Sequence, residues 1–158
     1  MAFSVPCDLK AGALELAKAK NYFSMKQLLV SLDEKIKKKI EQMPDRINDD
    51  NYGSIKHFKD FDDRYAAPIN GFEDTEDYWA KCSSGRFLAS IKVPALIVNA
   101  QDDPFLAPSC YPIQQAENSR CVHLEIPRSG GHVGFVQFNS DGSYWPENRA
   151  VDFLGQEW

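Results

Sequence analysis

The sequence predicts an α/β fold with a short parallel sheet, and its second half carries the two observations behind this. Residues 95–100 and 122–126 are mainly apolar runs, as expected for strands buried on both faces of a parallel sheet. A short helix over 112–117 separates them, and another opens at Trp145-Pro146. The resulting order of strand, helix, strand and helix is that of a βαβ unit.

Length and charge narrow the class of protein. A chain of 158 residues favours one domain. A net charge of -5 argues against a broad nucleic-acid-binding surface, which needs a basic excess. Residues 1–6 lack the charged start of a signal peptide, and no apolar run approaches the ~20 residues that span a bilayer. We therefore expect a cytoplasmic protein without a transmembrane segment.

The four cysteines of the chain are expected to be reduced thiols. None of them has the C-x-x-C spacing of a zinc or redox site, and a cytoplasmic location disfavours disulfides. They are Cys7, Cys82, Cys110 and Cys121.

The N-terminal residues predict the end of a strand followed by a helix. Phe3-Ser4-Val5 is short and apolar and is stopped by Pro6. Asp8 suits a helix N-cap. The residues that share one face of this helix are Leu9, Ala13, Leu16 and Ala17.

A longer second helix follows. Ser24 and Gln27 have the spacing of a capping box, and Pro44 ends the segment. Lysines within 35–39 could attract anionic lipid or nucleic acid, but a solvated helix face is the simpler interpretation. The apolar stripe is interpreted as packing surface: Met25, Leu28, Leu29, Leu32, Ile36, Ile40 and Met43.

Residues 44–90 mix loops with short helical segments. Asp60, Asp62 and Asp63 resemble a calcium loop only superficially, since the glycine and distal glutamate of an EF-hand are absent. His57 has no ligand-spaced partner and is interpreted as structural. No metal is expected at His123, His132 and Cys121 either, since His123 lies on a buried strand and no ligand spacing supports a site. Asp74 caps a short helix that 83–85 ends. In the last helix of the chain, the residues expected to face inward are Ala150, Val151 and Leu154.

An acid and a histidine follow the two predicted strands. Asp103 comes after the run 95–100, and His132 lies among glycines after the run 122–126. Ligands bind outside the carboxyl ends of parallel strands, so both residues belong at one edge of the sheet. A carboxylate on one imidazole nitrogen fixes the tautomer and leaves the other nitrogen free to activate a nucleophile. The pattern therefore predicts an acid–base pair.

These residues resemble a known family. The segment 94–105, followed by Gly130-Gly131-His132-Val133-Gly134-Phe135, looks like the YheT-type branch of the α/β-hydrolases. Further resemblance lies in residues 4–9 (Ser-Val-Pro-Cys-Asp-Leu) and 61–63 (Phe-Asp-Asp). It continues through Ala67-Pro68, Gly71-Phe72 and Asp77-Tyr78-Trp79, and so covers nearly the whole chain.

The resemblance implies roles for the acid and the base. Asp103 stands where the family has its acid, and His132 where it has its base. Asp102 is the rival acid; Asp103 is preferred because the superfamily pattern is small-x-x-Asp, here with Ala100. No Gly-x-Ser-x-Gly nucleophile elbow occurs in the sequence. The chain thus resembles the C-terminal part of a hydrolase that lacks the nucleophile half.

The resemblance also implies an architecture. We expect a single partial α/β-hydrolase domain over 1–158, with a helical cap insertion at about 10–90 and a βαβ-α segment at 91–158 that carries acid and base. A sheet of about three strands would leave an edge open to a partner chain or a second copy, so we expect a homo-oligomer. Six aromatic residues could line an acyl pocket or simply pack the cap: Phe58, Phe61, Tyr65, Phe72, Tyr78 and Trp79.

Two functions remain open at this point. In the first, the chain supplies the Asp-His part of a serine hydrolase acting on carboxylic esters, with a small ester or lipid-like substrate and no cofactor. In the second, it is a non-catalytic binding or assembly module, or a truncated remnant that is inactive as an isolated chain.

Overall fold

A computed structural model describes residues 1–136 and 142–156 and gives the expected α/β fold. A three-stranded parallel sheet has the order β1 (Ala2–Phe3), β2 (Ala95–Val98) and β3 (Val122–Glu125). In the register, Ala2 lies opposite Ile97 on one side of β2, and Ala95 lies opposite Val122 on the other. The predicted fold class, including about three parallel strands and flanking helices, is confirmed.

The alternation of side chains along β2 gives the sheet two packed faces. Leu96 and Val98 are buried in one cluster with Phe153 of helix α7 (Trp145–Leu154). Ile97 is buried in another cluster, against which helix α6 (Ile113–Glu117) packs through Ala116. A strand covered on both sides explains why all four residues of β2 are apolar.

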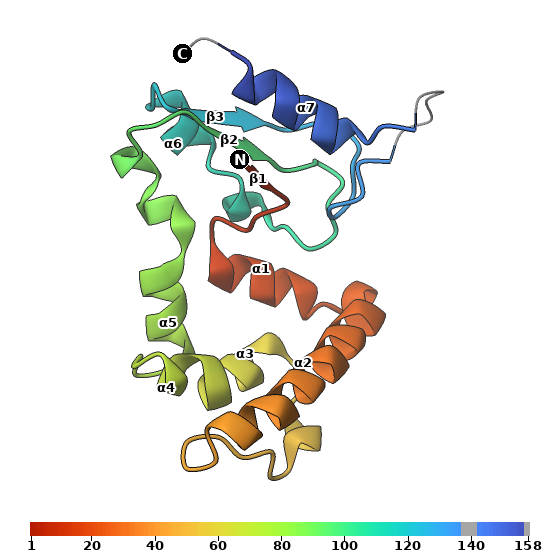
Figure 1. Cartoon of the computed structure of the whole chain (residues 1–158), viewed down its shortest axis with the longest axis vertical. Coiled ribbons are helices and arrows are strands. Elements are labelled where there is room, and N and C mark those ends of the chain that lie inside the picture. Colours follow the sequence, from red (N-terminus) through yellow and green to blue (C-terminus); the bar gives the residue numbers. More distant parts are fainter. Residues whose placement is uncertain (137–141, 157–158) are drawn as a thin grey trace.

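A helical insertion lies between β1 and β2. It consists of α1 (Leu9–Leu16), α2 (Tyr22–Gln42), α3 (Phe58–Phe61), a π-helical turn (Asp62–Ala66), α4 (Ala67–Ile69) and α5 (Thr75–Cys82). Helices α2, α3 and α4 lie at the end of the molecule away from α7, and α1 lies between them and the sheet (Figure 1). The insertion has its own core of Leu16, Met25, Leu29, Ile36, Ile47, Ile55 and Tyr65.

Two predicted helix starts are confirmed. Asp8 is the N-cap of α1, and its side chain accepts a hydrogen bond from the Ala11 amide at 3.0 Å. Asp74 caps α5 in the same way, accepting from the Asp77 amide at 2.8 Å. In both cases a short acidic side chain satisfies an amide that the first helical turn leaves unpaired.

The predicted capping box of the second helix is wrong. Helix α2 begins at Tyr22, so Ser24 lies inside its first turn. A 3-10 turn over Ala19–Asn21 runs directly into the helix and starts it early. The apolar stripe is nevertheless a packing surface, since Met25, Leu29 and Ile36 are buried.

The predicted inward face of the last helix is wrong at two of its three residues, since only Ala150 is half-buried. Val151 and Leu154 are 70% and 75% exposed, whereas Phe153 is buried. Arg149, one turn before Phe153, turns inward because its guanidinium forms a paired contact with the Glu125 carboxylate of β3. The buried Phe153 ring and the ion pair of Arg149 with the neighbouring strand together define the face of α7 that lies against the sheet.

The described residues contain no helix that is both long and apolar enough to cross a membrane. Within the same ranges, no three His, Cys, Asp or Glu side chains gather as metal ligands would. All four cysteines are free thiols.

Candidate active site

Asp103 and His132 are in contact at the carboxyl edge of the sheet. The Asp103 Oδ2 and His132 Nδ1 atoms are 2.9 Å apart, although 29 positions separate the residues in the sequence. The Asp103 side chain is fully buried, and the His132 side chain is 33% exposed. The acid is thus shielded from water while the imidazole remains accessible.

The two adjacent acids of the turn after β2, Asp102 and Asp103, make different contacts. The second carboxylate oxygen of Asp103 accepts a hydrogen bond from the Phe105 amide at 2.9 Å, which fixes the orientation of the group. Asp102 does not contact the imidazole. Its Oδ1 accepts from the Gly130 and Gly131 amides, at 2.9 and 2.8 Å. The geometry therefore pairs the histidine with Asp103 and assigns Asp102 to the backbone of the histidine loop.

The histidine loop has a backbone that demands glycine at two positions. A Cβ on Gly130 would lie 2.5 Å from the Phe135 ring and 2.8 Å from the Ala100 Cβ. Gly131 has a φ of 58°, in the left-handed region that other residues rarely adopt. The buried ring of Phe135 then anchors the end of the loop in the core below the sheet.

Ser4, from the other end of the chain, also holds this loop. Its Oγ accepts a hydrogen bond from the Val133 amide at 3.0 Å. Ser4 is 5% exposed with a φ of 52°, and Val133 has a φ of 58°. Two non-glycine residues in strained conformations, joined by one hydrogen bond next to His132, indicate a place where the surrounding structure enforces geometry.

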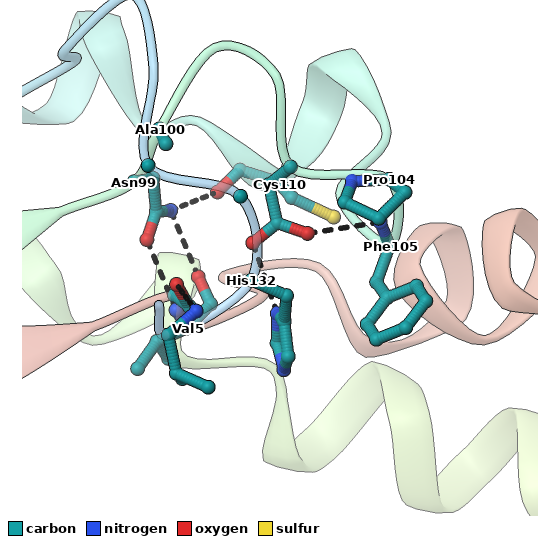
Figure 2. A network of polar contacts seen from close by, with 12 residues as sticks. Val5, Asn99, Ala100, Pro104, Phe105, Cys110 and His132 are labelled. Carbon is teal, nitrogen blue, oxygen red and sulfur yellow. Dashed lines mark hydrogen bonds and ion pairs between the residues drawn. The ribbon is translucent and has the colours of Figure 1, made fainter. Parts of the chain in front are cut away.

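Asn99 ties the ends of β1 and β2 together. It is fully buried, and its Oδ1 accepts from the Val5 amide at 3.0 Å while its Nδ2 donates to the Val5 carbonyl at 2.9 Å. Figure 2 shows this amide bonded to Val5 and to the Cys110 carbonyl, with the His132 ring nearby and beside that of Phe105. The side chain continues the ladder between the strands past their last backbone pairs, which fixes the segment that carries Ser4.

His132 lines a cavity of about 470 Å³ between the sheet edge and the helical insertion. Three of the six aromatic residues singled out from the sequence, Phe58, Tyr78 and Trp79, line it as well. Phe61 and Tyr65 instead pack in the core of the insertion, and Phe72 packs on Tyr78 with the ring centres 5.3 Å apart. The remaining lining residues are mainly apolar: Ser4, Pro6, Leu9, Gly12, Ala13, Leu16, Leu28, Asp62, Phe105 and Leu106.

Asp62 is the acid in the lining of this cavity. Its Oδ2 accepts a hydrogen bond from the Trp79 Nε1 at 2.8 Å. Burial raises the pKa of the Asp62 carboxyl, and this hydrogen bond opposes the rise only in part. The carboxyl therefore adds one polar group to a mainly apolar wall.

The arrangement is suited to proton transfer at the cavity. A carboxylate at Nδ1 favours the tautomer with its proton on that nitrogen, so that Nε2 can accept a proton. The Nε2 end of the ring points away from the carboxylate (Figure 2). Among residues 1–136 and 142–156, no hydroxyl or thiol is hydrogen-bonded to Nε2.

Comparison with known proteins agrees with this architecture. The chain is 30% identical over 154 residues to YheT of Escherichia coli K12, which carries a provisional esterase name; the match spans 96% of this chain and 45% of that protein. It is 30% identical over 145 residues to the phospholipase ABHD3 of Mus musculus, spanning 91% of this chain and 34% of the relative. The matches lie mainly in the C-terminal parts of these α/β-hydrolases.

The chain belongs to the YheT-like branch of the α/β-hydrolases. The YheT-like chain spans less than half the length of these two relatives. A shorter match joins it to the medium-chain fatty acid ethyl ester synthase/esterase 2 of Saccharomyces cerevisiae, with 31% identity over 102 residues, 64% of this chain and 22% of the relative. No protein-family model matches the chain, and no solved structure matches it significantly.

Sequence reasoning missed two residues of this YheT-like site. Asn99 lies inside an apolar run, so the sequence did not indicate that this buried side chain would bond two segments together. Ser4 was noted only as part of a strand end and of the family resemblance. A polar residue at the end of a buried strand is the signal that would have singled out both.

Proposed function

We propose that this chain supplies the acid and the base of a serine hydrolase that acts on carboxylic esters. His132 is the general base and acid, and Asp103 orients it and stabilises the imidazolium. The observation that carries the proposal is the 2.9 Å contact between a fully buried carboxylate and an imidazole that lines an apolar cavity.

The cavity supports an ester with an apolar acyl or alkyl part. Phe58, Trp79 and Leu106 offer apolar surface, and few polar groups compete for the substrate. The names of the mouse and yeast relatives, a phospholipase and a fatty acid ethyl ester synthase/esterase, concern esters of the same broad class.

The nucleophile in this proposal is a serine on a polypeptide segment outside the printed 158 residues. Strand β1 is the outermost strand on its side of the sheet, so its free edge is the place where such a segment would add. The proposal requires a strand beside β1 that presents its serine to the His132 Nε2, whether that strand lies on the same polypeptide or on a second one.

The test combines the chain with a nucleophile-bearing partner. The full chain is purified alone and also co-expressed with the part of Escherichia coli YheT that precedes the matched region. Hydrolysis of p-nitrophenyl esters is then measured. We expect no turnover by the chain alone and turnover by the assembled pair, abolished by His132→Ala.

The controls separate the proposal from its alternative. Turnover by the chain alone that His132→Ala abolishes would require a nucleophile inside these residues. A pair that assembles with correct stoichiometry but shows no turnover would favour a binding or assembly module.

The free edge of β1 also supports self-association of the chain alone. A second copy can pair with the same backbone groups that a nucleophile-bearing segment would use. Light scattering at micromolar concentration is expected to show a dimer or larger species, and addition of the partner segment should convert it to a heterodimer. A stable monomer would contradict this part of the proposal.

A further inference from the structure

A second cavity, of about 400 Å³, lies on the insertion between α2 and the segment 52–57. It shares no lining residue with the cavity of His132. Leu28 faces the His132 cavity and Leu29 faces this one, so the two hollows flank α2 on different sides. We name the second cavity the α2 groove.

The floor of the α2 groove is apolar and well fixed. Met25, Leu29 and Ile55 are all buried, at 4%, 9% and 7% exposed. Tyr52 closes the floor, where its hydroxyl donates to the Leu29 carbonyl at 2.7 Å. Burial raises the pKa of Tyr52 to about 12, so this hydroxyl remains a neutral donor over the physiological range.

The rim of the groove is cationic. Lys18, Lys26 and Lys56 all line it. The Lys56 amine donates to the Gly53 carbonyl at 2.5 Å, and Lys26 has no ion-pair partner among the residues that the structure describes. Asp33, the acid in the lining, is already paired with Lys37 at 2.7 Å. Lys18 is paired with Glu15 at 2.6 Å. The positive charges of Lys26 and Lys56 are therefore the two at the rim that no neighbouring acid among the described residues offsets.

The charge of this region contrasts with that of the rest of the chain. Residues 18–39 contain seven lysines and two acids, for a net charge of +5, in a chain whose total is -5. The remainder therefore carries -10. The exposed apolar side chains Tyr22 and Val30, at 59% and 54%, border the groove within this basic region. A ligand with an apolar chain and an anionic head matches both surfaces.

We propose that the α2 groove binds a single-chain fatty-acid carboxylate. The alkyl chain lies on Met25, Leu29 and Ile55, and the carboxylate pairs with Lys26 and Lys56. This site is separate from the Asp103–His132 pair, and it stands whether or not the chain takes part in ester hydrolysis.

Calorimetric titration of the full chain with decanoate, below the concentration at which it forms micelles, tests the proposal. Decanoate is expected to bind more tightly than decanol or decyltrimethylammonium. Octanoate should bind about 15-fold more weakly than decanoate, since each buried methylene contributes roughly fourfold in affinity.

Matched variants locate the site. Lys26→Glu should weaken decanoate binding roughly tenfold, as expected for reversal of one charge beside the ligand. Lys38→Glu, the same change on an exposed part of the same helix outside the groove, should change it less than twofold. Gly53→Leu should abolish binding without loss of thermal stability, because nothing lies within 4 Å of a Cβ placed there.

Several outcomes would overturn the proposal. Equal affinity for the three decyl compounds would mean apolar adsorption only, and equal effects of the Lys26 and Lys38 variants would mean attraction by overall charge. Binding to vesicles of anionic lipid but not to free decanoate would mean that this face recognises a membrane surface instead. The ester hydrolysis measured for the assembled pair is independent of all these results.

Discussion

The helical insertion and the site at the sheet edge are held together in different ways. The insertion is organised by residues close in sequence, such as Met25, Leu29 and Ile36 on one face of α2. The site is organised by single polar contacts between distant segments. Ser4 bonds to Val133 across 129 positions, and Asp103 reaches His132 across 29.

This difference predicts how strongly a single substitution affects each region. Apolar packing in the insertion is spread over many contacts, so one lost side chain leaves most of them in place. At the sheet edge, each buried polar group depends on one hydrogen-bonding partner. Removal of that partner leaves the remaining group without a hydrogen bond. We therefore expect conservative changes to have larger effects at the edge than in the insertion.

The largest expected effect separates the two acids of one turn. In the assembled enzyme proposed above, Asp103→Asn should lower kcat by about 10⁴-fold, as the equivalent change does in serine-protease triads, because the asparagine favours the wrong imidazole tautomer. Asp102→Asn should lower it by no more than roughly tenfold, because Asp102 contacts only the loop amides. Initial rates with a p-nitrophenyl ester measure both.

Equal losses for the two variants would mean that the contact with the imidazole is not what matters for catalysis. Unchanged activity in Asp103→Asn would remove the acid–base assignment altogether. Circular dichroism of both variants checks that the fold is retained.

The next effect compares two glycines, one from each region. Gly130→Ala should destabilise the chain by about 3 kcal/mol, since the new methyl group meets the Phe135 ring and the Ala100 Cβ. Gly53→Ala in the insertion should be neutral or stabilise by up to ~1 kcal/mol, because the space is open and the unfolded chain loses freedom. Urea denaturation measures both, and similar midpoints would contradict the close packing of the histidine loop.

The same contrast explains how far the sequence could be interpreted. The strands at 95–100 and 122–126, the caps Asp8 and Asp74, and the stripe of α2 are local patterns, and all appear in the structure. The pairing of Asp103 with His132 could also be anticipated, because parallel strands bring their carboxyl ends to one edge. The strand pattern alone left either Asp102 or Asp103 as the partner of the histidine. The fold shows that Asp103 contacts the imidazole and that Asp102 contacts the loop amides.

Other features depend on contacts that no local pattern contains. The face that α7 turns to the sheet includes Arg149 because it meets Glu125, and the start of α2 depends on a preceding 3-10 turn. The bond from the Val133 amide to Ser4 joins opposite ends of the chain. Periodicity identifies which side chains are apolar, but it does not identify which polar partner a distant segment will bring.

A smaller effect is expected at Ser4. Ser4→Ala removes the acceptor of the Val133 amide and should cost about 1–2 kcal/mol of stability. It should also shift the ring NMR signals of His132, because the loop that carries the imidazole loses an anchor. Tyr52→Phe removes a hydrogen bond of similar length in the insertion and should leave those signals in place. If Ser4→Ala also left them in place, Ser4 would have no part in positioning the base.

The smallest expected effects have opposite signs at two adjacent acids of the insertion. Burial raises the pKa of Asp62, so its charged form destabilises the fold, and that penalty appears as the pH rises through the folded pKa. Burial also acts on Asp63, but hydrogen bonds from Lys59 and Thr75 outweigh it and hold the pKa of Asp63 below its usual value. The stability that Asp63 provides is present above its unfolded pKa and lost as the pH falls.

Asparagine at each position should therefore separate the two acids. Asp62→Asn should raise Tm slightly at pH 7, because the amide keeps an acceptor for Trp79 without the charge. Asp63→Asn should lower Tm slightly at pH 7, because the contact with Lys59 loses its charge. Both differences should fade as the pH falls, that of Asp62→Asn first and that of Asp63→Asn only at lower pH, because the pKa of Asp63 is held below its usual value. A Tm change of the same sign in both variants would mean that local packing, rather than ionisation, governs these two positions.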